Sequence, residues 1–182
     1  MIETERLILR NWTPDDAESM FKYASDPDVG PHAGWAPHES IEFSREIVSD
    51  FSKRPNCFAI CLKGNDDPIG CIELKTPPCD LTDKSDESEL GYWIGKPYWN
   101  KSYMTEAARS VIKYGFETLN LSAIWCGYYD GNDRSKRVQE KLGFEYHHTT
   151  EGIYLSALNE TRTGHANLMT RENYMKKVAK NL

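Results

Sequence analysis

The residues best suited to chemistry lie in the loop WNKSYMTEA, residues 99–107, which runs directly into a predicted helix. Backbone N–H groups in the first turn of a helix have no intrahelical partner, and the helix dipole adds positive character there. Such a loop is a ready seat for a phosphate group. The first hypothesis is therefore a phosphate-bearing cofactor bound where this helix begins.

Spacing along the chain predicts the elements that must position this loop. Apolar residues between 104 and 119 recur at i, i+4, i+7, i+8, i+11 and i+15, which is one face of a helix. SELGYWI before the loop and SAIWCGYY after the helix are aromatic and β-prone, so we expect a strand at each place. Asn132 stands where an N-cap belongs, and Gly143 followed by Phe144 matches a Schellman stop. A second helix is predicted between them.

Length and composition limit the class of protein. A chain of 182 residues fits one domain, here residues 1–182, with a core of its own. The mean hydropathy of -0.66 and the lack of a long apolar run argue against a membrane span. The formal charge of -6 argues against a nucleic-acid binder, which needs a basic stripe. We expect a globular protein without direct nucleic-acid or membrane partners.

The cysteines indicate a reducing compartment. There are 5 of them, an odd number, without a CxxC pair, and the start MIETERLILR has no signal-peptide pattern. These features predict free thiols and a cytoplasmic location. Cys57 and Cys61 alternate with apolar residues in CFAICL, which favours strand packing. No metal is expected, because His147 and His148 are neighbours that would point to opposite faces of a strand.

The rest of the chain predicts a mixed sheet with helices. ERLILRNW alternates like a strand, and Thr13 followed by Pro14 signals a helix start. Residues 25–38 are expected to form a loop rich in Pro and Gly, and residues 43–51 a second helix with Phe43 on its apolar side. CFAICLK and PIGCIELK, joined by GNDD, predict a hairpin, and HANLMTRENYMKKV predicts a strand running into a last helix. The expected order is β-α-α-β-β-β-α-β-α-β-β.

Two other phosphate-binding patterns fit less well. The dinucleotide fingerprint GxGxxG is absent. Residues 95–102, GKPYWNKS, match the P-loop GxxxxGK[ST] except at Asn100, where a second glycine would let the backbone wrap phosphate. Pro97 and Trp99 would also crowd such a loop. An NTPase is therefore the poorer alternative.

Three phrases in matching order and spacing carry a resemblance that covers nearly the whole chain. TERLILRNWTPDDA, ELGYWI followed by YWNKSYMTEA, and NDRSKRVQEKLGF resemble the GNAT acyltransferase superfamily, in particular its ribosomal-protein-alanine N-acetyltransferase-like (RimJ/RimL) branch. The resemblance implies a single GNAT-like domain of α+β or α/β class, with a mixed and mostly antiparallel sheet flanked by helices. It implies an N-acetyltransferase that moves acetyl from acetyl-CoA to a primary amine by direct attack in a ternary complex. A homodimer is a further expectation.

The resemblance also implies a cofactor site. The superfamily loop pattern (Q/R)xxGx(G/A) falls on residues 99–104, where Trp99, Ser102 and Met104 replace the expected residues. The Ser102 side chain could hinder the approach of a pyrophosphate to the backbone. A second class of function therefore stays open, a CoA-binding but catalytically weak sensor or interaction protein. The expected cofactor contacts are Tyr92, Trp93, Ile94, Asn100, Lys101, Ser102, Tyr103, Met104, Thr105, Asn132 and Ser135.

Catalysis by such a protein asks for a base and for hydrogen-bond donors. An amine attacks a thioester only when neutral, and alkyl and terminal amines have pKa values of roughly 10 and 8, so a base or a water relay helps. The resemblance implies that Glu89 is this base. It is equally consistent with the sequence that Glu89 is only a solvated acid at the end of a strand. A strand N–H within residues 92–94 could stabilise the oxyanion. The resemblance places Asn132 and Ser135 where the CoA thiolate needs a hydrogen bond, and Asn132 is expected to be an N-cap in any case.

The acceptor is less well specified. Trp35, in the loop rich in Pro and Gly, is expected to pack or to bind substrate together with Glu89. The acidic run from Asp80 to Glu87 is interpreted as a solvated surface. A protein N-terminus, an amino sugar, a polyamine and an amino acid all remain open as the amine.

Overall fold

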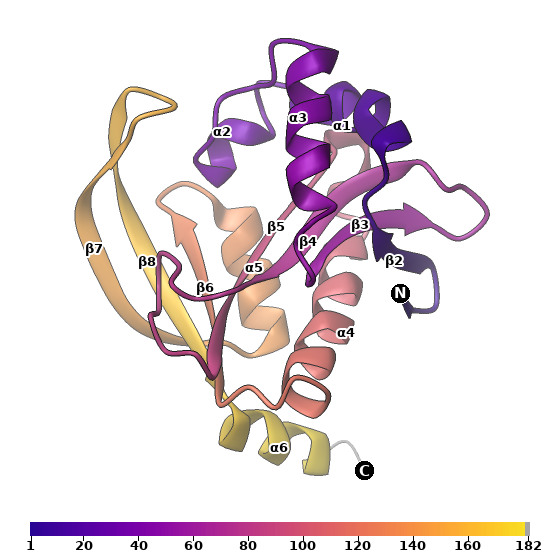
Figure 1. Cartoon of the computed structure of the whole chain (residues 1–182). Coiled ribbons are helices and arrows are strands. Elements are labelled where there is room, and N and C mark those ends of the chain that lie inside the picture. The colour runs from indigo at the N-terminus through magenta and orange to yellow at the C-terminus, as the bar shows by residue number, and fades with distance from the viewer. Residues whose placement is uncertain (181–182) are drawn as a thin grey trace.

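A computed structural model describes residues 1–180 and shows an eight-stranded sheet with helices on both faces (Figure 1). All neighbouring strands are antiparallel except β5 and β6, which are parallel. This confirms the mixed, mostly antiparallel sheet. In sheet order the strands are β1 (Ile2–Glu3), β2 (Leu7–Asn11), β3 (Cys57–Leu62), β4 (Pro68–Lys75), β5 (Glu87–Ile94), β6 (Ala123–Tyr129), β8 (Glu160–Thr170) and β7 (Glu145–Leu155).

The helices form two layers around this sheet. One layer packs on the face of β3 to β6, and the other covers the opposite face, while the last helix follows β8 (Figure 1). No helix within residues 1–180 is both long and apolar enough to span a membrane. The first layer holds η1 (Pro14–Asp16), α1 (Ala17–Ala24), α2 (Gly30–Ala33) and α3 (Ile41–Phe51); the second holds η2 (Lys96–Tyr98), α4 (Tyr103–Glu117) and α5 (Asp133–Leu142); the last helix is α6 (Arg171–Lys180).

Alternation along β3 divides the core into two clusters. Phe58 and Ile60 pack in the cluster beneath α4, whereas Cys57, Ala59 and Cys61 pack beneath α1 and α3. All five side chains are buried. The expected role of the cysteines in strand packing is confirmed, and the sheet is a rigid base for the site.

The ends of α5 follow the signals in the sequence. The Asn132 side chain accepts a hydrogen bond from the Ser135 N–H, as an N-cap should. Gly143 has φ 83, in the left-handed region, and the Phe144 N–H donates to the Gln139 carbonyl at 3.0 Å. This is the predicted Schellman stop.

Two expectations about the first half of the chain were wrong. Residues 25–38 are not a plain loop, because the short helix α2 forms there and ends at Gly34 with φ 91, so three helices rather than two follow β2. Phe43 does not lie on the buried side of α3, since it is 43% exposed. Ser44 is buried instead, because its hydroxyl bonds to the His38 ring at 2.8 Å.

Candidate active site

β5 and β6 separate partway along their length. Their pairing covers the first three residues of each strand and ends at Glu89 and Trp125. Beyond that point the other edge of β5 still pairs with β4. The Leu90 carbonyl faces β6, since it accepts from the Cys126 thiol at 3.3 Å. Backbone groups two residues apart point to the same edge of a strand, so the Tyr92 N–H faces the gap.

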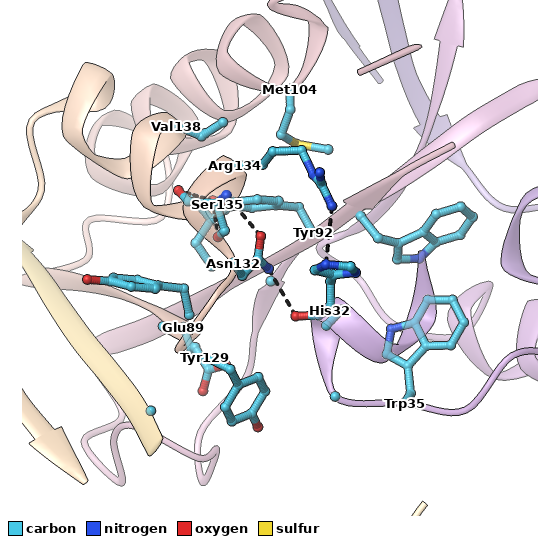
Figure 2. A pocket seen from close by; sticks show the side chains of 18 of the residues that line it. His32, Trp35, Glu89, Tyr92, Met104, Tyr129, Asn132, Arg134, Ser135 and Val138 are labelled. Atoms are coloured by element: carbon cyan, nitrogen blue, oxygen red, sulfur yellow. Dashed lines mark hydrogen bonds between the residues drawn. The ribbon is translucent and has the colours of Figure 1, made fainter. Parts of the chain in front are cut away.

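A cleft of about 1030 Å³ passes through this gap. Ligand pockets usually measure about 300–1,000 Å³, so the cleft is large enough for a cofactor and part of a second substrate. Figure 2 shows side chains from β5, α2 and α5 converging on it. Eight of the expected cofactor contacts line the cleft: Tyr92, Trp93, Ile94, Asn100, Ser102, Met104, Asn132 and Ser135.

Three expected contacts lie outside the lining. Thr105 is only 8% exposed and belongs to the buried face of α4. The Tyr103 ring turns toward Arg6, whose guanidinium lies 4.5 Å from its centre. The Lys101 ammonium lies 5.7 Å from the Tyr98 ring instead of in the cleft. Their side chains therefore support the loop from outside.

The loop before α4 has an unusual backbone. Asn100 and Ser102 have φ 60 and φ 62, in the left-handed region where glycine is favoured. This gives a physical reason for the glycine of the superfamily pattern at position 102. Ser102 is the N-cap of α4, but its side chain makes no capping hydrogen bond. The N–H groups of the first turn are left available to an anion.

Three basic residues of α5 also line the cleft. They were not singled out in the sequence. Arg134, Arg137 and Lys141 follow each other at i, i+3 and i+7, a spacing on one helix face that could have revealed them. The Arg134 guanidinium lies 3.9 Å from the Trp99 ring centre. Trp99 is itself fixed, because its indole N–H donates to the Ile94 carbonyl at 2.8 Å. This end of the cleft is suited to phosphate groups.

Asn132, Ser135 and Tyr92 meet in the middle of the cleft (Figure 2). Asn132 accepts from the Ser135 N–H at 3.2 Å and donates through Nδ2 to the His32 carbonyl at 2.9 Å. The Ser135 hydroxyl lies 2.9 Å from the Tyr92 hydroxyl. Burial raises the pKa of Tyr92 well above its ordinary value, so this phenol keeps its proton.

Glu89 is not a solvated strand-end acid. It is 7% exposed, and it lines the cleft. Its carboxylate accepts from the Lys75 ammonium at 2.6 Å and from the Leu81 N–H at 3.2 Å. Although burial alone would lower the pKa of Lys75, the Glu89 carboxylate raises it above its ordinary value. Lys75 stays charged and holds Glu89 in place.

The acidic run after β4 is only partly a solvated surface. Glu87 is 5% exposed, which contradicts that interpretation for this residue. Its carboxylate accepts from the Trp125 indole at 2.6 Å and from the Lys84 ammonium at 2.9 Å, so it anchors the start of β5. Asp80 is exposed, lines the cleft and lies 3.4 Å from the Lys75 ammonium.

Aromatic residues form the other end of the cleft. Trp35 packs edge-to-face on Trp93 with ring centres 6.0 Å apart, and both line the cleft. A Cβ at Gly30 would lie 2.5 Å from the Trp35 ring, and one at Gly34 would lie 2.9 Å from the Tyr129 ring. The two glycines therefore let the backbone of α2 and its C-cap lie closely against the Trp35 and Tyr129 rings.

The site draws on both faces of the sheet. Glu89 and Trp93 alternate with Tyr92 along β5, so their side chains point to opposite faces. Trp93 contacts Trp35 on one face, and Tyr92 contacts Ser135 on the other. The gap between β5 and β6 joins the two faces. A group entering beside α4 can therefore reach a group held near α2.

A helix start with open N–H groups, beside a sheet that opens between two parallel strands, can hold an anionic ligand next to a second substrate. The chain matches the acetyltransferase (GNAT) domain over residues 6–145 and belongs to that family. This confirms the resemblance, the fold class and the expectation of an acyltransferase enzyme.

Relatives agree with this assignment. The N-acetyltransferase YoaA of Bacillus subtilis is 32% identical over 150 residues, covering 80% of this chain and 82% of the relative. The B. subtilis protein named "Putative ribosomal N-acetyltransferase YdaF" is 32% identical over 163 residues, covering 85% and 87%. A GNAT acetyltransferase structure from Bacillus anthracis has a TM-score of 0.83 at 26% identity, covering 94% of this chain and 98% of that one.

Proposed function

We propose that this chain transfers an acetyl group from acetyl-CoA to a primary amine held at the Trp35 end of the cleft, with both substrates bound together. The observation that carries the proposal is the gap between β5 and β6. Through this gap one cleft joins the anion seat at Ser102 to the Ser135 hydroxyl and to the Glu89 carboxylate.

The chain's own groups fit the cofactor. The open N–H groups at the start of α4 and the side chains of Arg134, Arg137 and Lys141 suit its phosphates. Met104 lines the cleft between them and the gap, as does Val138 of α5. Acetyl-CoA supplies an acetyl group activated as a thioester.

Each remaining step is assigned to one group of the chain. The Tyr92 N–H faces the gap, where it can donate to the acetyl carbonyl oxygen. The Ser135 hydroxyl can donate to the departing sulfur. Glu89 takes the proton that the ammonium of the acceptor must lose, directly or through a water molecule. Lys75 keeps Glu89 fixed while it does so.

The acceptor end suits an amine that arrives as a cation. Trp35, Trp93 and Tyr129 line this end with aromatic rings, and the carboxylates of Glu89 and Asp80, which both pair with Lys75, lie there too. The net charge of -6 favours the approach of cations. YdaF is named for a ribosomal acceptor, so the N-terminal amine of a ribosomal protein belongs among the substrates tested.

A turnover assay tests the proposal. Purified protein is given acetyl-CoA with N-terminal peptides, polyamines, amino sugars or amino acids, and free thiol is measured. We expect release that depends on one class of amine and falls in the Ser135→Ala variant. Failure of acetyl-CoA to bind would reject the proposal.

A second function rests on the serine at position 102. A side chain there at φ 62 is strained and projects where the superfamily has glycine. A CoA-binding sensor with weak catalysis would bind acetyl-CoA with an ordinary affinity and release no thiol with any amine. The same panel, together with a binding titration, separates the two functions.

A further inference from the structure

A chain of buried polar side chains leads from the cleft, beneath α5, to β8. Gln139 of α5 is 0% exposed. Its Oε1 accepts from the Asn167 amide at 2.7 Å, and its Nε2 lies 3.0 Å from the Gly127 carbonyl and 3.1 Å from the Ser135 hydroxyl. A buried amide is costly unless its groups are bonded, and those of Gln139 are.

The Gly127 carbonyl determines the orientation of this amide. A carbonyl oxygen only accepts, so the Gln139 atom beside it must be the nitrogen. The second N–H of the same nitrogen then points to the Ser135 hydroxyl, one helical turn earlier. Ser135 therefore receives a hydrogen bond from within the protein.

That hydrogen bond limits where the Ser135 proton can go. A serine hydroxyl has two acceptor positions and one proton. Gln139 occupies one acceptor position, and the Tyr92 hydroxyl, 2.9 Å away, occupies the other when it donates. The Ser135 proton is then free to point into the cleft, which Ser135 lines.

A competing arrangement has Ser135 donating to the Tyr92 oxygen while Tyr92 donates to the Ser135 carbonyl, 3.3 Å away, and then no proton faces the cleft. The bond from Gln139 keeps the Ser135 proton off the side that faces Gln139. Because successive hydrogen bonds polarise one another, it also makes the Ser135 hydroxyl a stronger donor to a group in the cleft. We propose that Gln139 is a positioning residue that directs the Ser135 hydroxyl as a donor into the cleft. The inference rests on the proposed function, in which Ser135 serves the cofactor sulfur.

The first test is a binding comparison by calorimetry with CoA and desulfo-CoA, which lacks the sulfur. We expect the intact protein to bind CoA roughly fivefold more tightly, the effect of one hydrogen bond. Ser135→Ala should abolish this preference, Gln139→Met should reduce it, and the double variant should lose no more than Ser135→Ala alone. Turnover should follow the same non-additive pattern.

Asn167→Ala is the matched control, because it removes the contact between α5 and β8 and leaves the bonds from Gln139 to Gly127 and Ser135 in place. It should lower thermal stability and keep the preference for CoA. A purely structural role for Gln139 predicts that both variants lose stability and neither changes the preference. If Gln139→Met does not fold, Gln139→Leu combined with Asn167→Leu replaces both buried amides with apolar groups and takes its place.

The outcomes separate this inference from the proposed function. If turnover depends on Ser135 but the Gln139→Met variant keeps the full preference for CoA over desulfo-CoA, the inference about Gln139 is wrong and the proposed function stands. The same holds if the intact protein turns over but binds CoA and desulfo-CoA equally. Absence of CoA binding overturns both.

Discussion

The Asn132 amide joins two segments 100 positions apart, because its oxygen caps α5 while its nitrogen donates to the His32 carbonyl of α2 (Figure 2). The same side chain therefore caps a helix that lines the cleft and holds α2, which precedes Trp35 in the chain. The two bonds can be separated by substitution.

Asn132→Ala should lower the unfolding free energy by about 1 kcal/mol through loss of the cap, and should impair turnover. Asn132→Asp keeps an acceptor for the Ser135 N–H but has no donor for His32. It should retain most of the stability and raise the KM for the amine by roughly fivefold. Denaturant unfolding and steady-state kinetics measure the two effects. Asn132→Asp kinetics equal to those of the intact protein would show that the bond to His32 is unimportant.

Ser102→Gly should stabilise the protein by about 1 kcal/mol, because it relieves a left-handed backbone. Acetyl-CoA binding should stay intact or improve. Asn120, with φ 56, is a control outside the cleft lining, and Asn120→Gly should stabilise slightly without any change in binding. Marked weakening of binding in Ser102→Gly would instead make the hydroxyl a phosphate ligand.

Acetyl-CoA at about a hundred times its Kd should stabilise the protein by about 2.7 kcal/mol, measured as a thermal shift.

Arg134→Ala should weaken acetyl-CoA binding by about tenfold, because a cation at the phosphate end of the cleft is lost. Lys136→Ala, an exposed residue of the same helix outside the cleft lining, is the control. The difference between the two should shrink as salt rises. If Arg134→Ala weakens acetyl-CoA binding no more than Lys136→Ala does, the cofactor phosphates do not bind beside Arg134.

Glu89→Gln should lower turnover by about 100-fold near neutral pH with little change in acetyl-CoA affinity. The defect should become smaller as pH rises, because more of the amine is then neutral without help. Glu73→Gln is the control, since Glu73 also lines the cleft but pairs with Arg54. It should leave the pH dependence as it is. Full activity of Glu89→Gln at neutral pH would restrict Glu89 to anchoring the strand.

Glu106 should make stability depend on pH. Although burial alone would raise the pKa of Glu106, hydrogen bonds from Thr4 and Arg6 hold it below its ordinary value. Its contribution is therefore fully present above the pKa of the unfolded chain, about 4.3, and is lost as pH falls through the lower folded pKa. Unfolding of Glu106→Gln should differ from that of the intact protein at pH 7 and converge with it in acid. Glu140→Gln, at an exposed position of α5, should show no such trend.

The sequence correctly predicted those features that depend on residues close together in the chain. The period of α4, the Asn132 cap and the Schellman stop at Gly143 depend on contacts within a few positions, so residue type and spacing predict them. The family was predicted in the same way, because its phrases WNKSYMTEA and NDRS are local. The occurrence of α2 was missed, because a helix of one turn has too few positions for a period.

The sequence by itself therefore determined the family, most of the elements, the start of α4 and the N-cap of α5. Tertiary structure alone decided where the chemistry meets. Lys75 lies beside Glu89 because of the register between β4 and β5. Gln139 reaches the Gly127 carbonyl only once α5 packs on β6. These contacts join residues on different elements, and no local period encodes the register and packing that bring them together.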